Sequence, residues 1–542
     1  MLGPGTQAWS KHILAKLTLF RCHGHFSAIS GYWPRVKQQF SLVSEADERS
    51  SPLGDGVRPP PLEQIDSATI EDQDVFIVDW NDPDDIPNHQ NWPDSRKWTA
   101  TVLVLLLALL VGVCAPIEAP IAELAARDFG VSEIVESLSV ALFLAGMGFG
   151  ALVAGPFSEV LGRSGTYTVA LLLMCIWLMA SPVSQHISPR LVFRFLGGFS
   201  GAAPLVCSGG TISDLWSPTD RTFPFLFFAI VGFGTPALGP VFSAWIPNSP
   251  HLHTWRWAEW VAVLFSGVVF IILLTFQPET YSPLLLSWKA RHLRNITGEG
   301  RYCARHELDK IRLPQRLRLA CARPFIMAWN ELTIKLASLY LSFVYIVLFT
   351  FFDGYPTIFQ ETYGLSTGMT FTLLAGITVG AACTAILGPI VHRKSVATKI
   401  STEQESRCVD PASRLWFAML AAPGLPISLF WMGWTAFSSI SIWSPLAASV
   451  LFGFSITGIF IGVSMYIIDV YARFAASAMA FTYLARCLAA AAMTVVGIPL
   501  YDNLGRHWTL TLLGCISVIL TPLPYIFFRF DSALQKNNSF MT

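Results

Sequence analysis

The chain has 542 residues, of which 53% are hydrophobic and only 13% are charged, and its formal net charge is zero. Ordinary globular domains contain roughly a quarter charged residues, so this composition disfavours a soluble enzyme. The neutral balance creates no field that would attract nucleic acid. Ten cysteines and eleven histidines show no metal-ligand spacing. We therefore expect no metal, no cofactor and no nucleic-acid partner.

The first 95 residues differ from the rest of the chain. Residues 1–44 contain basic residues and no acid, and residues 45–94 are rich in acids. Such polar composition is typical of disorder, so we predict a disordered cytoplasmic tail over residues 1–95. Two alternatives stay open for residues 1–44, which are a targeting signal and a misplaced start of the gene.

Apolar runs dominate the chain from about residue 98 onward. A run of about 20 residues crosses a bilayer as a helix that satisfies its own backbone hydrogen bonds. We predict an all-α membrane protein with twelve transmembrane helices, because roughly twelve such runs are present. They lie near residues 98–117, 134–154, 166–185, 191–211, 222–246, 257–276, 333–358, 370–391, 414–436, 442–467, 474–499 and 508–529.

The runs divide into six, a basic stretch, and six more. This layout is typical of transporters built from two similar halves around a midplane site. Lys and Arg mark cytoplasmic loops, and the stretch after the sixth run is rich in both, whereas the loops assigned outside hold only Arg127, Arg190, Arg256 and Arg506. We therefore predict an N-terminal six-helix bundle over 96–276, a cytoplasmic connector over 277–332, a C-terminal six-helix bundle over 333–530 and a cytoplasmic tail over 531–542.

The loop between the second and third runs carries Gly155, Glu159, Gly162 and Arg163. Glycines permit a tight turn between close helices, and an acid facing a helix N-terminus stabilises one packing of the two halves. We predict that this motif acts as a conformational switch. The alternative is an ordinary solvated turn.

Three charged residues within or beside the apolar runs are candidates for proton coupling, namely Glu118, Arg194 and Asp353. An arginine inside the membrane costs about 2.5–3.5 kcal/mol on insertion scales, so it normally has a partner and a function. A buried carboxyl favours its neutral form, which makes Asp353 the strongest candidate for proton or cation binding. The alternatives are an Arg194 that reaches the outer surface, and interfacial positions for Glu118 and Asp353.

The fifth run is rich in glycine and proline. Small residues let helices approach closely and proline bends a span, so ordinary membrane packing is one explanation of this pattern. The residues concerned are Gly232, Gly234, Pro236, Gly239 and Pro240.

These motifs, taken in their order and spacing, resemble the fungal twelve-span drug:proton antiporters of the major facilitator superfamily over roughly residues 79–530. The resemblance implies a role in proton coupling for Arg194 and antiport for the glycine-proline motif in the fifth run. Tyr340 and Tyr345 match the family's seventh span and either line the cavity or pack in the core. Further matches with a structural role are Pro278, Glu279, Tyr281, Asp469 and Arg486.

We therefore predict a secondary active transporter, not an enzyme, that exports drugs, polyamines or secondary metabolites in exchange for protons by alternating access. The chain has no Walker loop that would indicate an ATP-driven pump. Proton-coupled uptake and a non-transporting nutrient sensor on the same fold are the alternatives. The expected partners are the lipid bilayer, a small-molecule substrate and protons. We expect a monomer in the plasma membrane, with the vacuolar membrane as the alternative.

Overall fold

The computed structural model describes residues 76–80, 91–217, 220–247, 254–298, 300, 302–307, 313–393, 411–471 and 474–536. The chain divides into two units, Met1–Phe76 and Ile77–Thr542, and the described helices belong to the second. The predicted disordered tail falls largely outside the described residues.

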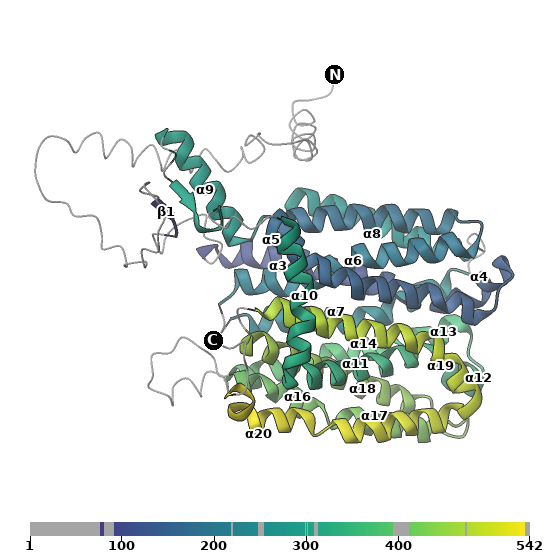
Figure 1. The fold of residues 1–542 in the computed structure, drawn as a ribbon. Coiled ribbons are helices and arrows are strands. Elements are labelled where there is room, and N and C mark those ends of the chain that lie inside the picture. The colour runs from purple at the N-terminus through teal and green to yellow at the C-terminus, as the bar shows by residue number, and fades with distance from the viewer. Residues whose placement is uncertain are drawn as a thin grey trace, which may run out of the picture. The chain divides into compact units, whose positions relative to one another are not determined.

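Helices form almost all of this second unit (Figure 1). We call α3–α8 the N-terminal half and α11–α20 the C-terminal half. The helices of the N-terminal half are α3 (Asp94–Cys114), α4 (Ala122–Phe129), α5 (Glu133–Val183), α6 (Ile187–Leu215), α7 (Thr222–Trp245) and α8 (Arg256–Phe276). Those of the C-terminal half are α11 (Leu332–Tyr355), α12 (Glu361–Tyr363), α13 (Thr367–Thr372), α14 (Ala375–Cys383), α16 (Trp416–Ala421), α17 (Gly424–Thr435), α18 (Trp443–Val470), α19 (Ala475–Leu520) and α20 (Leu523–Lys536).

The described residues contain 10 helical segments that are long and apolar enough to cross a membrane. Two of them, Glu133–Val183 and Ala475–Asp531, have 51 and 57 residues, about twice what one crossing needs. Each passes through a glycine with non-helical backbone angles, Gly162 at φ 80° and Gly505 at φ 70°. Residues with a side chain rarely adopt such positive φ values, whereas glycine adopts them freely. An all-α membrane fold is confirmed, and the count of twelve crossings stays a prediction that these two bent segments fit.

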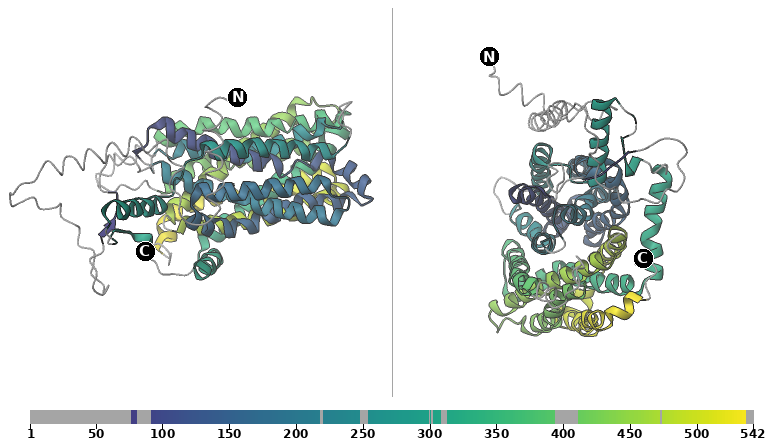
Figure 2. Two further views of the ribbon diagram at one scale, coloured as in Figure 1. Left: turned by 90° about the horizontal axis from the view of Figure 1, so that it is seen from above. Right: turned by 90° about the vertical axis from the view of Figure 1, so that its left-hand side faces the viewer.

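The two halves lie side by side with their long helices roughly parallel, as the end-on view in Figure 2 shows. Helix α5 packs against α6 within its own half and against α19 of the other half, and α7 packs against α14. Large apolar side chains also cover the outer surface, such as Leu264 and Ile519, which are 65% and 75% exposed. An apolar exterior is what a bilayer requires, since lipid tails surround the spans.

The connector is more ordered than a plain loop. It contains α9 (Ser282–Thr297), β2 (Tyr302–Ala304) and α10 (Leu313–Asn330). Strand β1 (Phe76–Val78) pairs with β2 in a two-stranded sheet, so these three residues of the tail are not disordered as predicted. The physical reason is apolar burial, because Val78 packs with Ala290 and Ala304.

An ion pair links α9 to the segment that follows β2. Arg294 donates hydrogen bonds to both carboxylate oxygens of Glu307, at 2.7 and 3.1 Å. These bonds favour the charged form and lower the pKa of Glu307.

Candidate functional site

A cluster of five charged side chains is buried inside the N-terminal half. Arg190 and Arg194 project from α6, and their partners are Glu118 after α3, Glu136 in α5 and Glu259 in α8. All five residues are at most 2% exposed. We refer to these five residues as the N-terminal charge cluster.

Each guanidinium of this cluster contacts more than one carboxylate. Arg190 Nη2 lies 2.8 Å from Glu118 Oε1 and 3.0 Å from Glu259 Oε1, and Arg190 also pairs with Glu136. Arg194 pairs with Glu118 and lies 3.2 Å from Glu259 Oε1. The two arginines are four residues apart on one helix, so they share a face and reach the same acids.

The second oxygen of each carboxylate is free. Oε2 of Glu118, Glu136 and Glu259 is buried and has no hydrogen-bond partner among the described residues. Unsatisfied buried acceptors are costly, and each can be satisfied by a proton or by water. The cluster therefore offers three acceptor positions where a proton can bind.

The cluster corrects one expectation and bears on two alternatives that the sequence left open. Arg190 is a buried helical residue and not an outer-loop charge. Glu118 is not an exposed interfacial acid, since it is 1% exposed, and Arg194 does not reach the outer surface, since it is 2% exposed. Sequence reasoning missed Glu136, Arg190 and Glu259, all of which sit near the ends of apolar runs and look there like interfacial charges.

Two buried charges of the C-terminal half, Asp353 and Arg486, stand apart from each other. Asp353 in α11 packs at Gly497 of α19, where a built Cβ would overlap its carboxyl. Its Oδ2 is buried with no hydrogen-bond partner among the described residues. The carboxyl oxygen is therefore withdrawn from the solvent contact that an interfacial position would give.

Arg486 in α19 is also buried, and it faces rings in place of acids. Its guanidinium lies over the rings of Tyr483, Tyr345 and Phe460, at 4.4, 4.8 and 4.9 Å from their centroids. We call these three rings with Arg486 the aromatic cage. Tyr345 belongs to this cage, while Tyr340 is fully buried in the core.

In the loop motif, Arg163 makes the main contacts, and one of its partners is Glu279, which is distant in the sequence. Arg163 Nε lies 3.3 Å from Asp214 of α6, and its Nη1 donates to Ser158 at 2.7 Å. The Glu279 carboxylate accepts the backbone N–H groups of Arg163 and Ser164, at 2.9 and 3.1 Å, and so caps the helix that restarts after Gly162. Burial raises the pKa of Glu279, and these N–H donors oppose that shift.

The other residues of the loop motif take a smaller part. Glu159 is half-buried and makes no ion pair within the part of the chain that the structure describes. A Cβ built at Gly155 meets nothing within 4 Å. Tyr281 stacks on Arg163, with the guanidinium 5.3 Å from the ring centroid, and follows the half-buried Pro278.

The glycine-proline motif of α7 lies on two packing surfaces. Gly239 packs against the backbone of Val113 in α3, where a side chain would not fit. Gly234 accepts a hydrogen bond from Thr378 Oγ1 of the C-terminal half at 2.8 Å. Pro236 and Pro240 are buried in α7, and Gly232 has open space beside it.

Asp469 at the end of α18 joins the two halves. It pairs with Arg221, which precedes α7, and accepts a hydrogen bond from Arg414 Nε at 2.9 Å. Arg414 Nη1 also donates to Thr222 Oγ1 of α7 at 2.6 Å. We call this group the inter-half seal. The predicted topology would place this seal on the cytoplasmic side.

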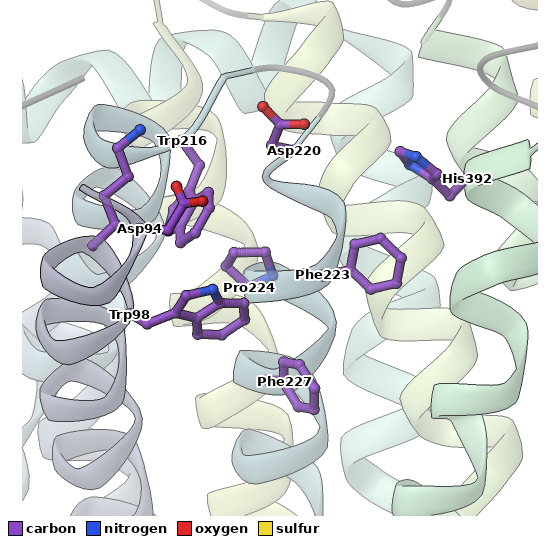
Figure 3. A pocket seen from close by; sticks show the side chains of 9 residues that line it. Asp94, Trp98, Trp216, Asp220, Phe223, Pro224, Phe227 and His392 are labelled. Carbon is purple, nitrogen blue, oxygen red and sulfur yellow. The ribbon is translucent and has the colours of Figure 1, made fainter. Parts of the chain in front are cut away.

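Figure 3 shows a pocket of about 590 Å³, whose lining includes Asp220 and Phe223, the sequence neighbours of Arg221 and Thr222 in the inter-half seal. It contains none of the sequence-predicted site residues. The described residues hold no group of three or more His, Cys, Asp or Glu side chains placed to bind a metal ion. The pocket is lined by Asp94, Lys97, Trp98, Trp216, Asp220, Phe223, Pro224, Phe227 and His392.

Known proteins resemble this chain over most of its length. The model of the Major Facilitator Superfamily matches residues 100–494. The MFS-type transporter kojT of Aspergillus oryzae is 44% identical over 472 residues, which are 86% of this chain and 83% of that protein. The ascochitine biosynthesis cluster MFS transporter of Didymella fabae is 32% identical over 470 residues, which are 86% of this chain and 90% of that protein.

Solved structures share the fold at low identity. The proton:xylose symporter XylE, bound to 6-bromo-6-deoxy-D-glucose, has a TM-score of 0.59 at 15% identity and covers 81% of this chain and 96% of its own. The human organic anion transporter MFSD10 (TETRAN) has a TM-score of 0.51 at 17% identity, with 80% and 99% covered. At these identities the likeness concerns the fold alone. Together with the family match and the relatives above 30% identity, it shows that the chain is a membrane transporter of the Major Facilitator Superfamily.

Proposed function

We propose that this transporter exports small organic molecules in exchange for protons, and that the N-terminal charge cluster is its proton site. The observation that carries the proposal is a charge imbalance. Three carboxylates face two guanidinium groups, so the cluster holds one excess negative charge when all five groups are ionised. Excess charge in the membrane interior is expensive, and one bound proton removes it.

Proton binding would be coupled to helix movement because it weakens ion pairs between helices. A proton on Glu118 weakens its attraction to Arg190 and Arg194, which hold α6 against the end of α3. Such a local change of charge biases a fold that has two alternative packings. The inter-half seal at Asp469 supports the same cycle, because breaking it separates the two halves at the other end.

Asp353 is a second candidate for proton or cation binding. It has no cationic partner among the described residues, and an isolated ionised carboxyl is disfavoured in a spanning helix. We assign it a supporting role, since protonation there would disrupt no ion pair.

The conformational motifs fit this proposal. Arg163 and the Glu279 cap fix the turn at Gly162 between two spans, and we propose that this turn, with Gly155 and Glu159, sets the relative position of the two spans that α5 contains. The glycine-proline motif lets α7 pack against both α3 and α14, so we propose that α7 transmits movement between the halves.

The relatives support export. One similar transporter is named for a biosynthesis cluster, that of ascochitine, and we propose that the present chain exports a secondary metabolite. Release from the cell would place the transporter in the plasma membrane. Both the charge cluster and the aromatic cage are complete within one chain, which supports a working monomer.

Proteoliposomes that contain the full chain test this function. An imposed proton gradient should concentrate substrate on the more acidic side, which is the signature of antiport. Substrate that moves with the protons would show uptake by symport instead. Glu118→Gln should abolish accumulation. Glu123→Gln, which alters a solvent-exposed acid of α4, is the matched control and should leave it unchanged.

A further inference from the structure

Arg486 is a spanning arginine that faces aromatic rings. It is 5% exposed, and its Nε and Nη1 atoms are buried with no acceptor among the described residues. Arg190 and Arg194, by contrast, both contact carboxylates. Three aromatic rings attract the Arg486 charge through their faces, but they do not accept its N–H groups as an oxygen would. Two of the three guanidinium nitrogens therefore lack an acceptor among the described residues.

The acid of the same half cannot supply this acceptor. Asp353 packs at Gly497, which lies eleven residues beyond Arg486 on α19, or about 16 Å along the helix axis at 1.5 Å per residue. A direct ion pair between these two groups is therefore out of reach. Each of them is available to a different ligand.

The aromatic cage lies where the two halves meet. Phe233 of α7 packs against Tyr345 and Phe460, with ring centroids 5.4 and 4.6 Å apart. A Cβ built at Gly148 of α5 lies 3.3 Å from Cys487, the neighbour of Arg486. Helices of the N-terminal half therefore cover the cage in this structure. Movement of the halves during alternating access would uncover it.

We propose that Arg486 and its cage bind the transported substrate, and that this substrate is an aromatic anion such as a carboxylate or an acidic phenol. The anionic oxygens would accept the free N–H groups of Arg486, since a planar guanidinium matches a carboxylate. The ring of the substrate would stack among Tyr345, Tyr483 and Phe460. This assignment rests on the proposed transport path between the halves, and it does not depend on how protons are coupled.

The positive charge of Arg486 disfavours the binding of cationic substrates. A buried positive charge repels an amine and cannot accept a hydrogen bond from it. Polyamines and basic drugs should therefore be poor ligands of the cage. This narrows the broad substrate range that the family resemblance allows.

Three probes with one ring and different charges test the assignment. Benzoate, benzamide and benzylamine would be titrated into the purified full chain, with the shift in melting temperature as the readout. Wild type should bind benzoate most tightly. Arg486→Gln should weaken benzoate binding about tenfold or more, the loss of a charge-assisted interaction, while benzamide binding stays the same. Arg486→Lys keeps the positive charge but lacks the planar guanidinium. Its benzoate affinity should fall between those of wild type and Arg486→Gln.

Arg127→Gln provides the control, because Arg127 is exposed on α4. Tighter binding of benzylamine, absence of benzoate binding to wild type, or an unchanged benzoate preference in Arg486→Gln would each overturn the assignment. Binding needs no proton gradient, so failure of proton coupling leaves this result intact. In the same way, loss of the anion preference would leave gradient-driven transport to be judged separately.

Discussion

The two halves of this transporter differ in how they hold the charges buried within their helix bundles. The N-terminal half gathers five charged groups into one cluster in which each arginine contacts two or more acids. The C-terminal half keeps Asp353 and Arg486 apart and leaves both with unsatisfied atoms. A paired cluster needs only a proton to change its balance, whereas an isolated charge needs a ligand. The difference suggests that one half handles the proton and the other handles the substrate.

Removing one arginine from each half should give the largest difference in stability between variants of the two halves. Arg190→Leu leaves three buried carboxylates facing a single guanidinium, and breaking a buried ion pair costs about 3–5 kcal/mol. Arg486→Leu leaves no acid unpaired and should change stability by only about 1 kcal/mol. Thermal unfolding of the purified variants measures both effects. Equal destabilisation would mean that the two halves do not differ in this respect.

Variants of the inter-half seal should have a smaller effect than these arginine substitutions. Asp469 joins Arg221 of the N-terminal half to Arg414 of the C-terminal half, while Asp214 pairs with Arg163 inside one half. Asp469→Asn should increase the population of cytoplasm-open molecules about tenfold, which lies within the usual range of coupling energies. Asp214→Asn should shift it much less.

Spin labels on α7 and α18, in a cysteine-free background, would report this opening as a change in distance between the helix ends that carry the seal. A larger shift for Asp214→Asn than for Asp469→Asn would assign the seal to the loop motif instead.

The smallest predicted contrast concerns two acids, Glu279 after the N-terminal half and Asp531 in the last helix of the C-terminal half. Glu279 accepts four backbone N–H groups, from Arg163, Ser164, Thr280 and Tyr281. Glu279→Ala should cost about 1–2 kcal/mol, as the loss of a helix cap does. Asp531, which accepts the Tyr466 hydroxyl at 2.7 Å, should cost about 1 kcal/mol when changed to Ala. Chemical unfolding of the two variants compares these costs, and the reverse order would contradict the capping role.

Much of the fold could be predicted from the sequence because a membrane span needs a long apolar run. The runs near 134–154 and 166–185 both lie in α5, and the bend between them falls at Gly162. The strand at Phe76–Val78 escaped prediction, because three apolar residues in a polar tail are a weak signal until β2 of the connector pairs with them.

The candidate site was only partly predictable. Arg194, Glu118 and Asp353 are visible as charges within or beside apolar runs. Arg190 looked like a loop residue, although its spacing of four from Arg194 places both on one helical face. That spacing was the available signal, since two arginines on a buried face require acids on neighbouring helices. Which acids these are depends on packing between α3, α5, α6 and α8, which no local pattern encodes.

Proton-driven accumulation tests the central claim most directly, namely that the N-terminal charge cluster carries the coupling. Full-length wild type, Glu118→Gln and Asp353→Asn would be reconstituted in proteoliposomes and compared with and without a pH gradient. We predict that Glu118→Gln still exchanges substrate across the membrane but no longer concentrates it when a gradient is imposed, while Asp353→Asn retains most of the accumulation. Undiminished accumulation by Glu118→Gln, together with its loss in Asp353→Asn, would contradict this account and move the coupling to the C-terminal half.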